Sequence, residues 1–160
     1  MHDQARIREV LPHRHPILLV DRVDEIVHFE SLTAVKAVTG SEPCYADMAE
    51  TAQGKDFAYP ASLILESFCQ AGAFLWLESM RAVDRRLDGK LVFALAKDVA
   101  FHLPVYPGDT LRHELRMDRV LGDNAFLSGR IRVGDAVVAE VGSLAAAIRR
   151  AADLDGPAGH

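Results

Sequence analysis

The chain has 160 residues, a formal net charge of −5 and 49% hydrophobic residues, which is typical of one soluble globular domain. The negative charge argues against a general nucleic-acid-binding protein, which normally presents a basic face. Cys44 and Cys69 are too few and too far apart for a disulfide framework or a cysteine metal site, which fits a reduced, cytoplasmic setting. We expect no signal peptide, because residues 1–4 lack an apolar stretch, and no membrane span, because Glu66 and Gln70 interrupt the most apolar segment.

Two predicted strands precede a long predicted helix. Residues 17–29 begin with four apolar residues and predict a strand, with which residues 32–38 are expected to pair. Residues 40–59 contain turn residues and few apolar anchors, so they predict a loop. Pro60 suits the first turn of a helix, because its missing N–H is not needed there. We therefore expect a helix over residues 61–83.

The apolar side chains of this helix cover most of its circumference, which is typical of a buried helix. Four strand-like runs follow over residues 91–148, and the last two breaks between them predict hairpin turns. The three breaks lie at 104–109, 122–124 and 134–135. This order predicts an α+β domain over residues 1–150, with a flexible tail at 151–160. An antiparallel sheet around one central helix, the hotdog fold, buries such a helix economically, although periodicity alone leaves other α+β folds open.

Glu66 is the residue of this helix with the clearest chemical potential. It is the only acidic or basic side chain between Ala61 and Leu77, and a buried carboxylate tends to hold its proton near neutral pH. Such a group is a candidate general acid or base. Gln70 lies four residues later, so both side chains share one helix face. The alternative is that Glu66 caps a loop or pairs with an arginine in the core.

Four segments together resemble one enzyme family. Residues 11–23 read L-P-H-R-H-P-I-L-L-V-D-R-V and resemble the opening L-P-H-R-Y-P-F-L-L-V-D-R-V of the FabZ-type 3-hydroxyacyl-[acyl-carrier-protein] dehydratases. Residues 36–43 resemble the family's K-x-V-T-x-N-E-P, and residues 60–70 resemble its helix start, P-G-V-L-I-I-E-A-x-x-Q. Residues 93–109 resemble its later F-A…F…P-V-x-P-G-D. The match runs through residues 5–149 in one order, so it is far more specific than any single motif.

The resemblance implies a hotdog fold and an active site between two subunits. In the family, a histidine from the loop before the helix meets a glutamate on the partner's helix, and Glu66 matches that glutamate. Ala61 stands where the family has glycine at the helix start, where backbone N–H groups polarise the thioester carbonyl. We expect Ala61, Gln70, Tyr59 and Met48 to contact the substrate, with no metal and no cofactor.

The resemblance also places Met48 where the family has its histidine. The family loop reads E-P-F-F-x-G-H-F-P, and residues 42–50 read E-P-C-Y-A-D-M-A-E. A thioether neither accepts nor delivers a proton at neutral pH, and no histidine occurs between Phe29 and Phe101. The loop before Pro60 is also longer than the family pattern. Three residues of the loop could carry a proton in place of the histidine, namely Tyr45, Asp47 and Tyr59. In the plainer interpretation they are ordinary loop residues.

The other histidines and the cysteines have structural interpretations. His13 matches a family position before the first strand and His15 replaces its tyrosine, so we expect packing or hydrogen-bonding roles for both. Three further histidines lack metal-ligand spacing and lie in or beside strands, namely His28, His102 and His113. Cys69 is expected to pack in the core. Cys44 replaces a phenylalanine near the site, and no histidine near it in sequence would activate its thiol.

Three functions remain open at this stage. The favoured one is a subunit of a heterodimeric dehydratase, in which this chain supplies Glu66 and a histidine-bearing hotdog chain supplies the other group. The second is a non-catalytic scaffold subunit that stabilises an active dehydratase, and the third is a thioesterase that uses Glu66 to activate water. The first two predict a hetero-oligomer, and without a partner chain we expect a homodimer. The expected substrate carrier is acyl-carrier protein, with no nucleic acid and no membrane. Its acidic surface requires a basic patch, for which the densest cluster is Arg81, Arg85, Arg86 and Lys90.

Overall fold

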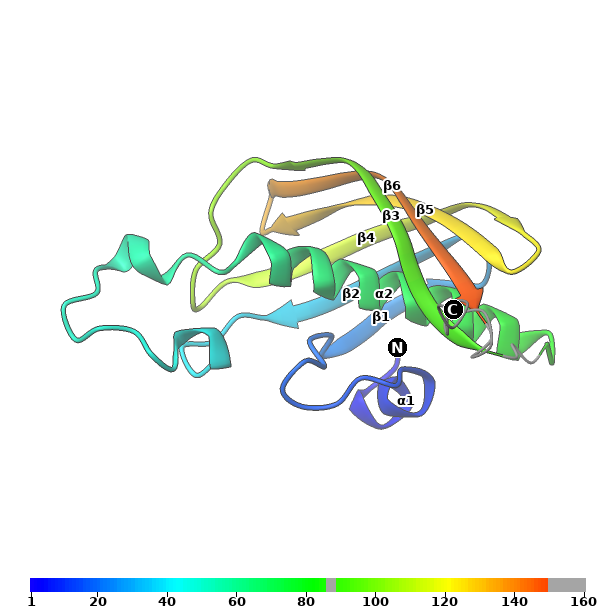
Figure 1. The fold of residues 1–160 in the computed structure, drawn as a ribbon, viewed down its shortest axis with the longest axis horizontal. Helices are drawn as coiled ribbons and strands as arrows, with labels where there is room; N and C mark the ends of the chain where they lie inside the picture. The colour runs from blue at the N-terminus through cyan, green and yellow to red at the C-terminus, as the bar shows by residue number, and fades with distance from the viewer. Residues whose placement is uncertain (86–88, 150–160) are drawn as a thin grey trace, which may run out of the picture.

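The computed structural model describes residues 1–85 and 89–149, which form one curved sheet around one long helix (Figure 1). The predicted tail at 151–160 lies outside the described residues. The elements are α1 (Gln4–Val10), β1 (Arg22–Val27), β2 (Ser31–Ala37), α2 (Ala61–Ala82), β3 (Lys90–Phe101), β4 (Thr110–Leu121), β5 (Asn124–Val133) and β6 (Ala136–Arg149). All strand pairs are antiparallel, in the order β1-β2-β4-β5-β6-β3. The predicted α+β hotdog fold is confirmed.

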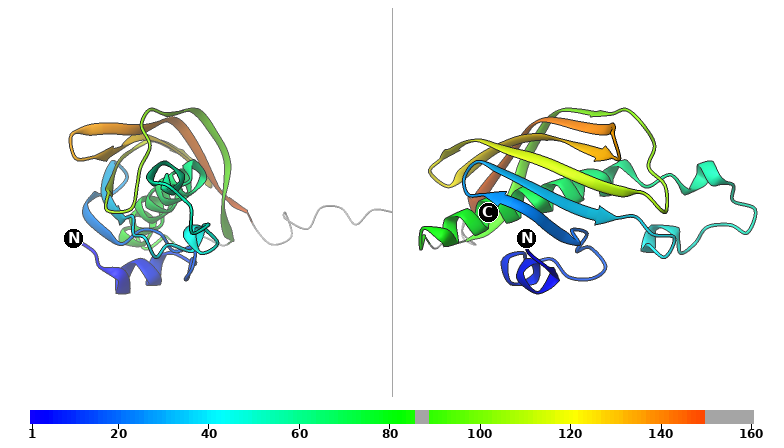
Figure 2. Two further views of the ribbon diagram at one scale, coloured as in Figure 1. Left: turned by 90° about the vertical axis from the view of Figure 1, so that its left-hand side faces the viewer. Right: turned by 180° about the vertical axis from the view of Figure 1, so that it is seen from behind.

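Helix α2 lies in the hollow of the sheet, as the view along its axis shows (Figure 2). Trp76, Phe68 and Phe74 are fully buried between the helix and the strands. The helix ends one residue before its predicted end. The segment Gly54–Ala82 is long and apolar enough to cross a membrane by length and composition, yet most of its apolar stretch is buried in the fold. Burial of this apolar surface is the main force that holds helix and sheet together.

The predicted start of the first strand is wrong, because β1 begins at Arg22 and not at residue 17. The backbone of Ile17 and Leu19 is hydrogen-bonded by the side chain of Gln70. The carbonyl of Val20 accepts a hydrogen bond from the side chain of Gln4 at 2.6 Å. Side-chain amides therefore satisfy backbone groups that a strand would give to its neighbour.

Helix α1 was not predicted, and it packs beside α2 at the N-terminal end of the chain. Asp3 caps it by accepting a hydrogen bond from the Arg6 N–H. The Arg6 guanidinium donates to both carboxylate oxygens of Glu78 on α2, at 2.7 and 2.9 Å. Since Glu78 is buried and carries a charge, this pair fixes α1 to the far end of α2.

The two edges of the sheet differ. Strand β1 is paired beyond β2 at Val23, whose N–H and carbonyl both bond to His2. Strand β3 pairs only with β6 among the described residues. Asp98 on β3 has a left-handed φ of 52°. The register with β6 shifts between Phe93 and Leu95, and the outer edge of β3 offers free backbone groups.

Candidate active site

Glu66 lies on α2 with 34% of its side chain exposed. Gln70, one helical turn later, is fully buried and donates a hydrogen bond of 2.8 Å to Oε1 of Glu66. Glu66 and Gln70 therefore lie on one helix face, as predicted, and are in direct contact. The carboxylate lies at the boundary between the core and solvent, which is where a proton-transfer group can both be held and reach a substrate.

The orientation of Gln70 is fixed by two further hydrogen bonds. Its Nε2 donates to the carbonyl of Ile17 at 2.6 Å, and its Oε1 accepts from the N–H of Leu19 at 2.8 Å. A flipped amide would set its oxygen against the Ile17 carbonyl and against Glu66, which are both acceptors. Gln70 therefore presents an N–H, and only an N–H, to Glu66.

His13 lies beside the same carboxylate. Its Nε2 is 3.6 Å from Oε1 of Glu66, and 25% of its side chain is exposed. Its Nδ1 is buried and has no hydrogen-bond partner among the described residues. The sequence predicted a packing or hydrogen-bonding role for His13 but not this neighbour. The signal for this neighbour was the motif of residues 11–23. It contains His13, and its later residues Ile17 and Leu19 bind Gln70, which in turn binds Glu66.

The start of α2 has unoccupied hydrogen-bond donors. Pro60 occupies the cap position and supplies no side-chain cap, while the N–H groups of Leu63 and Ile64 bond to its carbonyl. The N–H groups of Ala61 and Ser62 have no acceptor among the described residues, and both residues are exposed. Free N–H groups and the helix dipole favour negative charge at this point.

The predicted loop before α2 forms an arm that extends past the end of the sheet (Figure 1). Two short 3₁₀ helices interrupt it, Pro43–Tyr45 and Gly54–Phe57. The hydroxyl of Tyr45 donates to the carbonyl of Phe57 at 3.0 Å, and their rings lie 5.7 Å apart. Met48, between these helices, is partly buried against the core. The arm is therefore held at its base.

Tyr59 is 4% exposed and lies inside the fold. Its hydroxyl is buried without a hydrogen-bond partner among the described residues, and its ring is 5.8 Å from Nζ of Lys36. Burial and the nearby charge of Glu42 raise the pKa of the Tyr59 hydroxyl far above its ordinary value. Lys36 in turn forms a buried ion pair with Glu42. These groups support the base of the arm.

The two cysteines are free and are not activated as nucleophiles. Burial, followed by the charge of Glu42, raises the pKa of the Cys44 thiol. Burial, followed by the charge of Glu66, raises the pKa of Cys69 to about 12. A thiol is a nucleophile as the thiolate, so neither residue suits nucleophilic catalysis.

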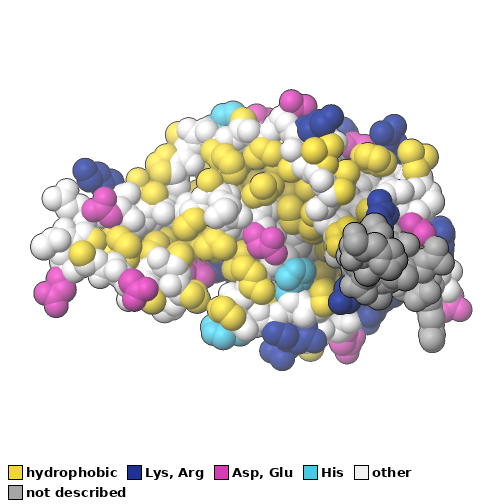
Figure 3. Space-filling model, viewed as in Figure 1, with side chains coloured by type: hydrophobic (Ala, Val, Ile, Leu, Met, Phe, Trp, Pro, Cys, Tyr) yellow, Lys and Arg dark blue, Asp and Glu magenta, His cyan; other side chains and the backbone are white. Residues whose placement is uncertain are grey.

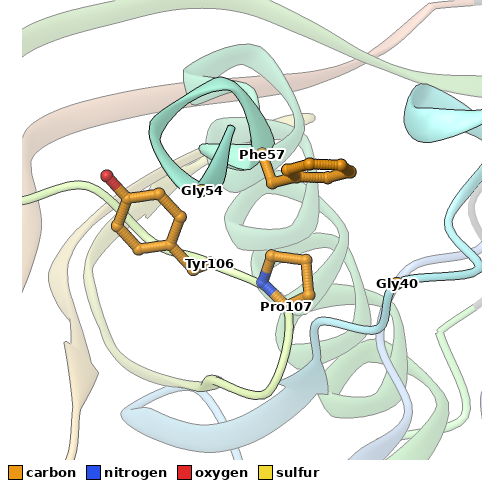
Figure 4. Close-up of a pocket in the computed structure, with 5 residues that line it drawn as sticks. All are labelled: Gly40, Gly54, Phe57, Tyr106 and Pro107. Atoms are coloured by element: carbon orange, nitrogen blue, oxygen red, sulfur yellow. The ribbon is translucent and has the colours of Figure 1, made fainter. Parts of the chain in front are cut away.

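An apolar hollow of about 560 Å³ lies between the arm and the connection from β3 to β4 (Figure 4). Phe57 projects from one side, while Tyr106 and Pro107 form the other. Gly40 and Gly54 complete its wall without side chains. Phe57 lies four residues before the start of α2, so this hollow is close along the chain to the exposed helix start.

The face that carries α2 and β3 is largely apolar (Figure 3). Hydrophobic side chains (yellow) gather over it, and an acidic side chain (magenta) lies beside a histidine (cyan) within it. Large exposed apolar residues are found on β3 and directly after it, namely Leu95, Phe101 and Leu103. An apolar face of this kind marks a surface that another chain covers.

The predicted basic cluster is only partly available for docking. Arg81 donates to the carbonyl of Glu9 at 2.8 Å, and Arg85 lies 3.8 Å from the carboxylate of Asp123. Lys90 is exposed at the start of β3, and Arg86 lies outside the described residues. Over residues 1–85 and 89–149, no group of three or more acidic, histidine or cysteine side chains is arranged to hold a metal ion.

A FabA-like domain model matches residues 11–142 of the chain. A 3-hydroxyacyl-[acyl-carrier-protein] dehydratase FabZ of Wolinella succinogenes is 38% identical over 145 residues, which cover 88% of this chain and 91% of the relative. The FabZ of Rhizorhabdus wittichii is 37% identical over 139 residues, which cover 86% and 84%. The chain belongs to the FabA-like dehydratase family.

Solved structures of much lower sequence identity share the hotdog fold. The dehydratase heterocomplex ApeI:P from Xenorhabdus doucetiae contains a chain with a TM-score of 0.77 at 14% identity, covering 92% of this chain and 93% of that one. Cj0977, a virulence protein of Campylobacter jejuni, gives 0.64 at 15% identity and covers 91% and 89%. At these identities the likeness establishes the hotdog fold and nothing finer.

Proposed function

We propose that this chain is the glutamate-bearing subunit of a heteromeric 3-hydroxyacyl-[acyl-carrier-protein] dehydratase. The observation that carries the proposal is Glu66, half-exposed on α2 and held by Gln70. Met48 stands where the family has its histidine, so a second hotdog chain supplies that histidine. The ApeI:P dehydratase of similar fold is a heterocomplex, which supports the pairing of two different chains.

The chemistry requires two proton transfers, one at each end of the C2–C3 bond. The partner's histidine removes the proton from C2 of the 3-hydroxyacyl thioester, and the C–H electrons form the C2=C3 double bond. Glu66 donates its proton to the C3 hydroxyl, the C–O electrons leave with the oxygen, and water departs. The free N–H groups of Ala61 and Ser62 stabilise the negative charge that develops on the thioester oxygen. The products are the 2-enoyl thioester, water, a protonated histidine and a Glu66 carboxylate.

The partner is expected on the face of α2 and β3. The open edge of β3 offers backbone hydrogen bonds to a second sheet, and the exposed Leu95 and Phe101 offer apolar contact beside it. Two sheets joined at this edge would form one continuous sheet. Light scattering of a stable monomer, both alone and with every candidate partner, would contradict this assembly.

The substrate arrives on an acyl-carrier protein, as the names of the FabZ relatives imply for those enzymes. Lys90, at the start of β3, is the exposed and unpaired member of the predicted basic cluster among the described residues. Arg85 has a distant ion pair that a carrier carboxylate could replace. We propose these two residues as the docking contacts for the acidic carrier.

The test is the Glu66→Gln variant, co-purified with a hotdog chain that carries the family histidine. Glutamine keeps the size of the side chain but cannot donate a proton as an acid, so turnover should fall about 100- to 10,000-fold. Assembly should be unchanged on size-exclusion chromatography. The matched control is Glu25→Gln on exposed β1, which should retain full turnover.

Two other outcomes would overturn the proposal. Unchanged turnover in the Glu66→Gln complex would mean that the partner performs the chemistry alone and that this chain is a scaffold. Release of free thiol from an acyl thioester by the isolated protein, lost in Glu66→Gln, would identify a thioesterase.

A further inference from the structure

The segment that carries His13 is fixed to the rest of the fold although it contains no helix or strand. The guanidinium of Arg14 donates to three backbone carbonyls, those of Arg8 at 2.9 Å, Leu11 at 2.8 Å and His13 at 2.6 Å. A few residues later, Gln70 binds the same segment at Ile17. The backbone on both sides of His13 is therefore anchored, and its imidazole has a defined place beside α2.

His13 and Gln70 both approach the same oxygen of Glu66. Gln70 donates to Oε1, and Nε2 of His13 is 3.6 Å from Oε1. This second distance is just beyond a hydrogen bond, so the contact is an electrostatic one at the present separation. Oε2 of Glu66 has no hydrogen-bond partner within the described part of the chain. The carboxylate is thus held at one oxygen and free at the other.

The tautomer of His13 follows from its buried nitrogen. Nδ1 has no acceptor among the described residues, so a hydrogen on Nδ1 would be a buried and unsatisfied donor. The hydrogen is better placed on Nε2, which faces the Glu66 carboxylate. His13 then presents a donor to Oε1, as Gln70 does.

We infer that His13 is a positioning residue for Glu66, which with Gln70 holds Oε1 and leaves Oε2 to exchange the proton with the substrate. The inference rests on the proposed function, since it assigns a role within the same site. His13 does not replace the family histidine, because it lies at the oxygen that Gln70 already holds and not at the free one. The Gln70 hydrogen bond and the nearby Nε2–H of His13 also stabilise the carboxylate that remains once water has left.

The test compares His13→Phe with His13→Gln in the complex with the histidine-bearing chain. Phenylalanine keeps a ring but removes the donor, so kcat should fall roughly 10- to 100-fold, with KM within about twofold. The limb of the pH–rate profile that belongs to the acid should move to higher pH. Glutamine restores an N–H at similar reach, so it should recover most of kcat. His28→Phe and His28→Gln, in an exposed turn, are the matched controls.

Two results would overturn the inference. One is a His13→Phe complex with the kcat and pH profile of the wild type. The other is an equal loss in His13→Phe and His13→Gln together with a lowered melting temperature, which would indicate that His13 only supports the fold.

A second measurement separates this inference from the proposed function. In the isolated full-length chain, the ¹⁵N resonance of His13 Nε2 should differ between the wild type and Glu66→Gln, because the contact is within one chain. If Glu66→Gln retains full turnover in the complex, the dehydratase role of Glu66 is refuted. The positioning contact is then decided by this resonance, and an identical resonance in both proteins would refute it.

Discussion

Replacing His113 by leucine should stabilise the protein and reduce the pH dependence of its unfolding free energy. His113 lies on β4 and is fully buried, with its ring edge against Phe68 at a centroid distance of 6.2 Å. Neither ring nitrogen has a hydrogen-bond partner among the described residues. Burial, followed by the positive charge of Lys36, lowers the pKa of His113 from 6.5 to about 3. The folded protein therefore keeps this imidazole neutral well into the acid range.

The sign of the effect follows from proton binding in the two states. Below about pH 6.5 the unfolded chain takes up a proton at His113, while the folded chain does so only near pH 3. The unfolded state binds more protons in this window, so stability falls as the pH falls. At pH 5 the loss through His113 is about 2 kcal/mol relative to pH 7. Leucine removes this loss, and it also removes two unsatisfied nitrogens, for a gain of about 1–3 kcal/mol at pH 7.

The assay is urea unfolding of wild type and His113→Leu at pH 5, 6 and 7, followed by the fluorescence of buried Trp76. Carboxylates that titrate in both proteins cancel in the difference between their two curves. The exposed His28→Leu is the control and should follow the wild type. If wild type and His113→Leu lose the same free energy between pH 7 and pH 5, the reasoning from burial is refuted.

Three further predictions concern activity and stability. The isolated chain, with Met48 in the arm, should show little dehydration of 3-hydroxyacyl substrates, and substantial turnover by pure protein would contradict this. Arg6→Ala leaves the buried carboxylate of Glu78 without its partner and should lower the unfolding free energy by about 1–3 kcal/mol in urea; a change below 0.5 kcal/mol, as for ordinary surface changes, would refute it. Asp98→Gly relieves a left-handed φ of 52° and should stabilise the folded protein by about 1 kcal/mol. Gly142→Ala should destabilise it, because the new Cβ would lie 2.8 Å from that of Asp98. An unchanged melting temperature in both variants would contradict this.

The regular elements could be predicted from the sequence because their signals are local. The helix over residues 61–83 was predicted from its apolar residues, and it ends at Ala82. The hairpin turns at 122–124 and 134–135 were predicted from turn residues, and Gly122 and Gly134 there have left-handed φ angles of 59° and 55°. Turn chemistry of this kind requires only neighbouring residues.

The remaining features could not be predicted, because they depend on contacts between distant residues. Helix α1 has seven residues, too few for a clear periodic pattern. Ile17 and its neighbours have strand-like side chains, yet their backbone bonds to Gln70, which lies 53 residues later. The approach of His13 to Glu66 crosses the same distance in sequence. Gln70 connects the segment of Ile17 and His13 to Glu66, and only the folded chain shows this connection.

The unequal edges of the sheet limit how many sheets can join edge to edge. One edge, at β1, is interrupted at Val23 by a bridge to His2 of the same chain, whereas the other, at β3, is open among the described residues. A protein with two open edges can add copies without end, as fibres do. A chain with one open edge is used up after a single pairing. Association through β3 therefore closes at two sheets when the second sheet, like this one, offers a single open edge.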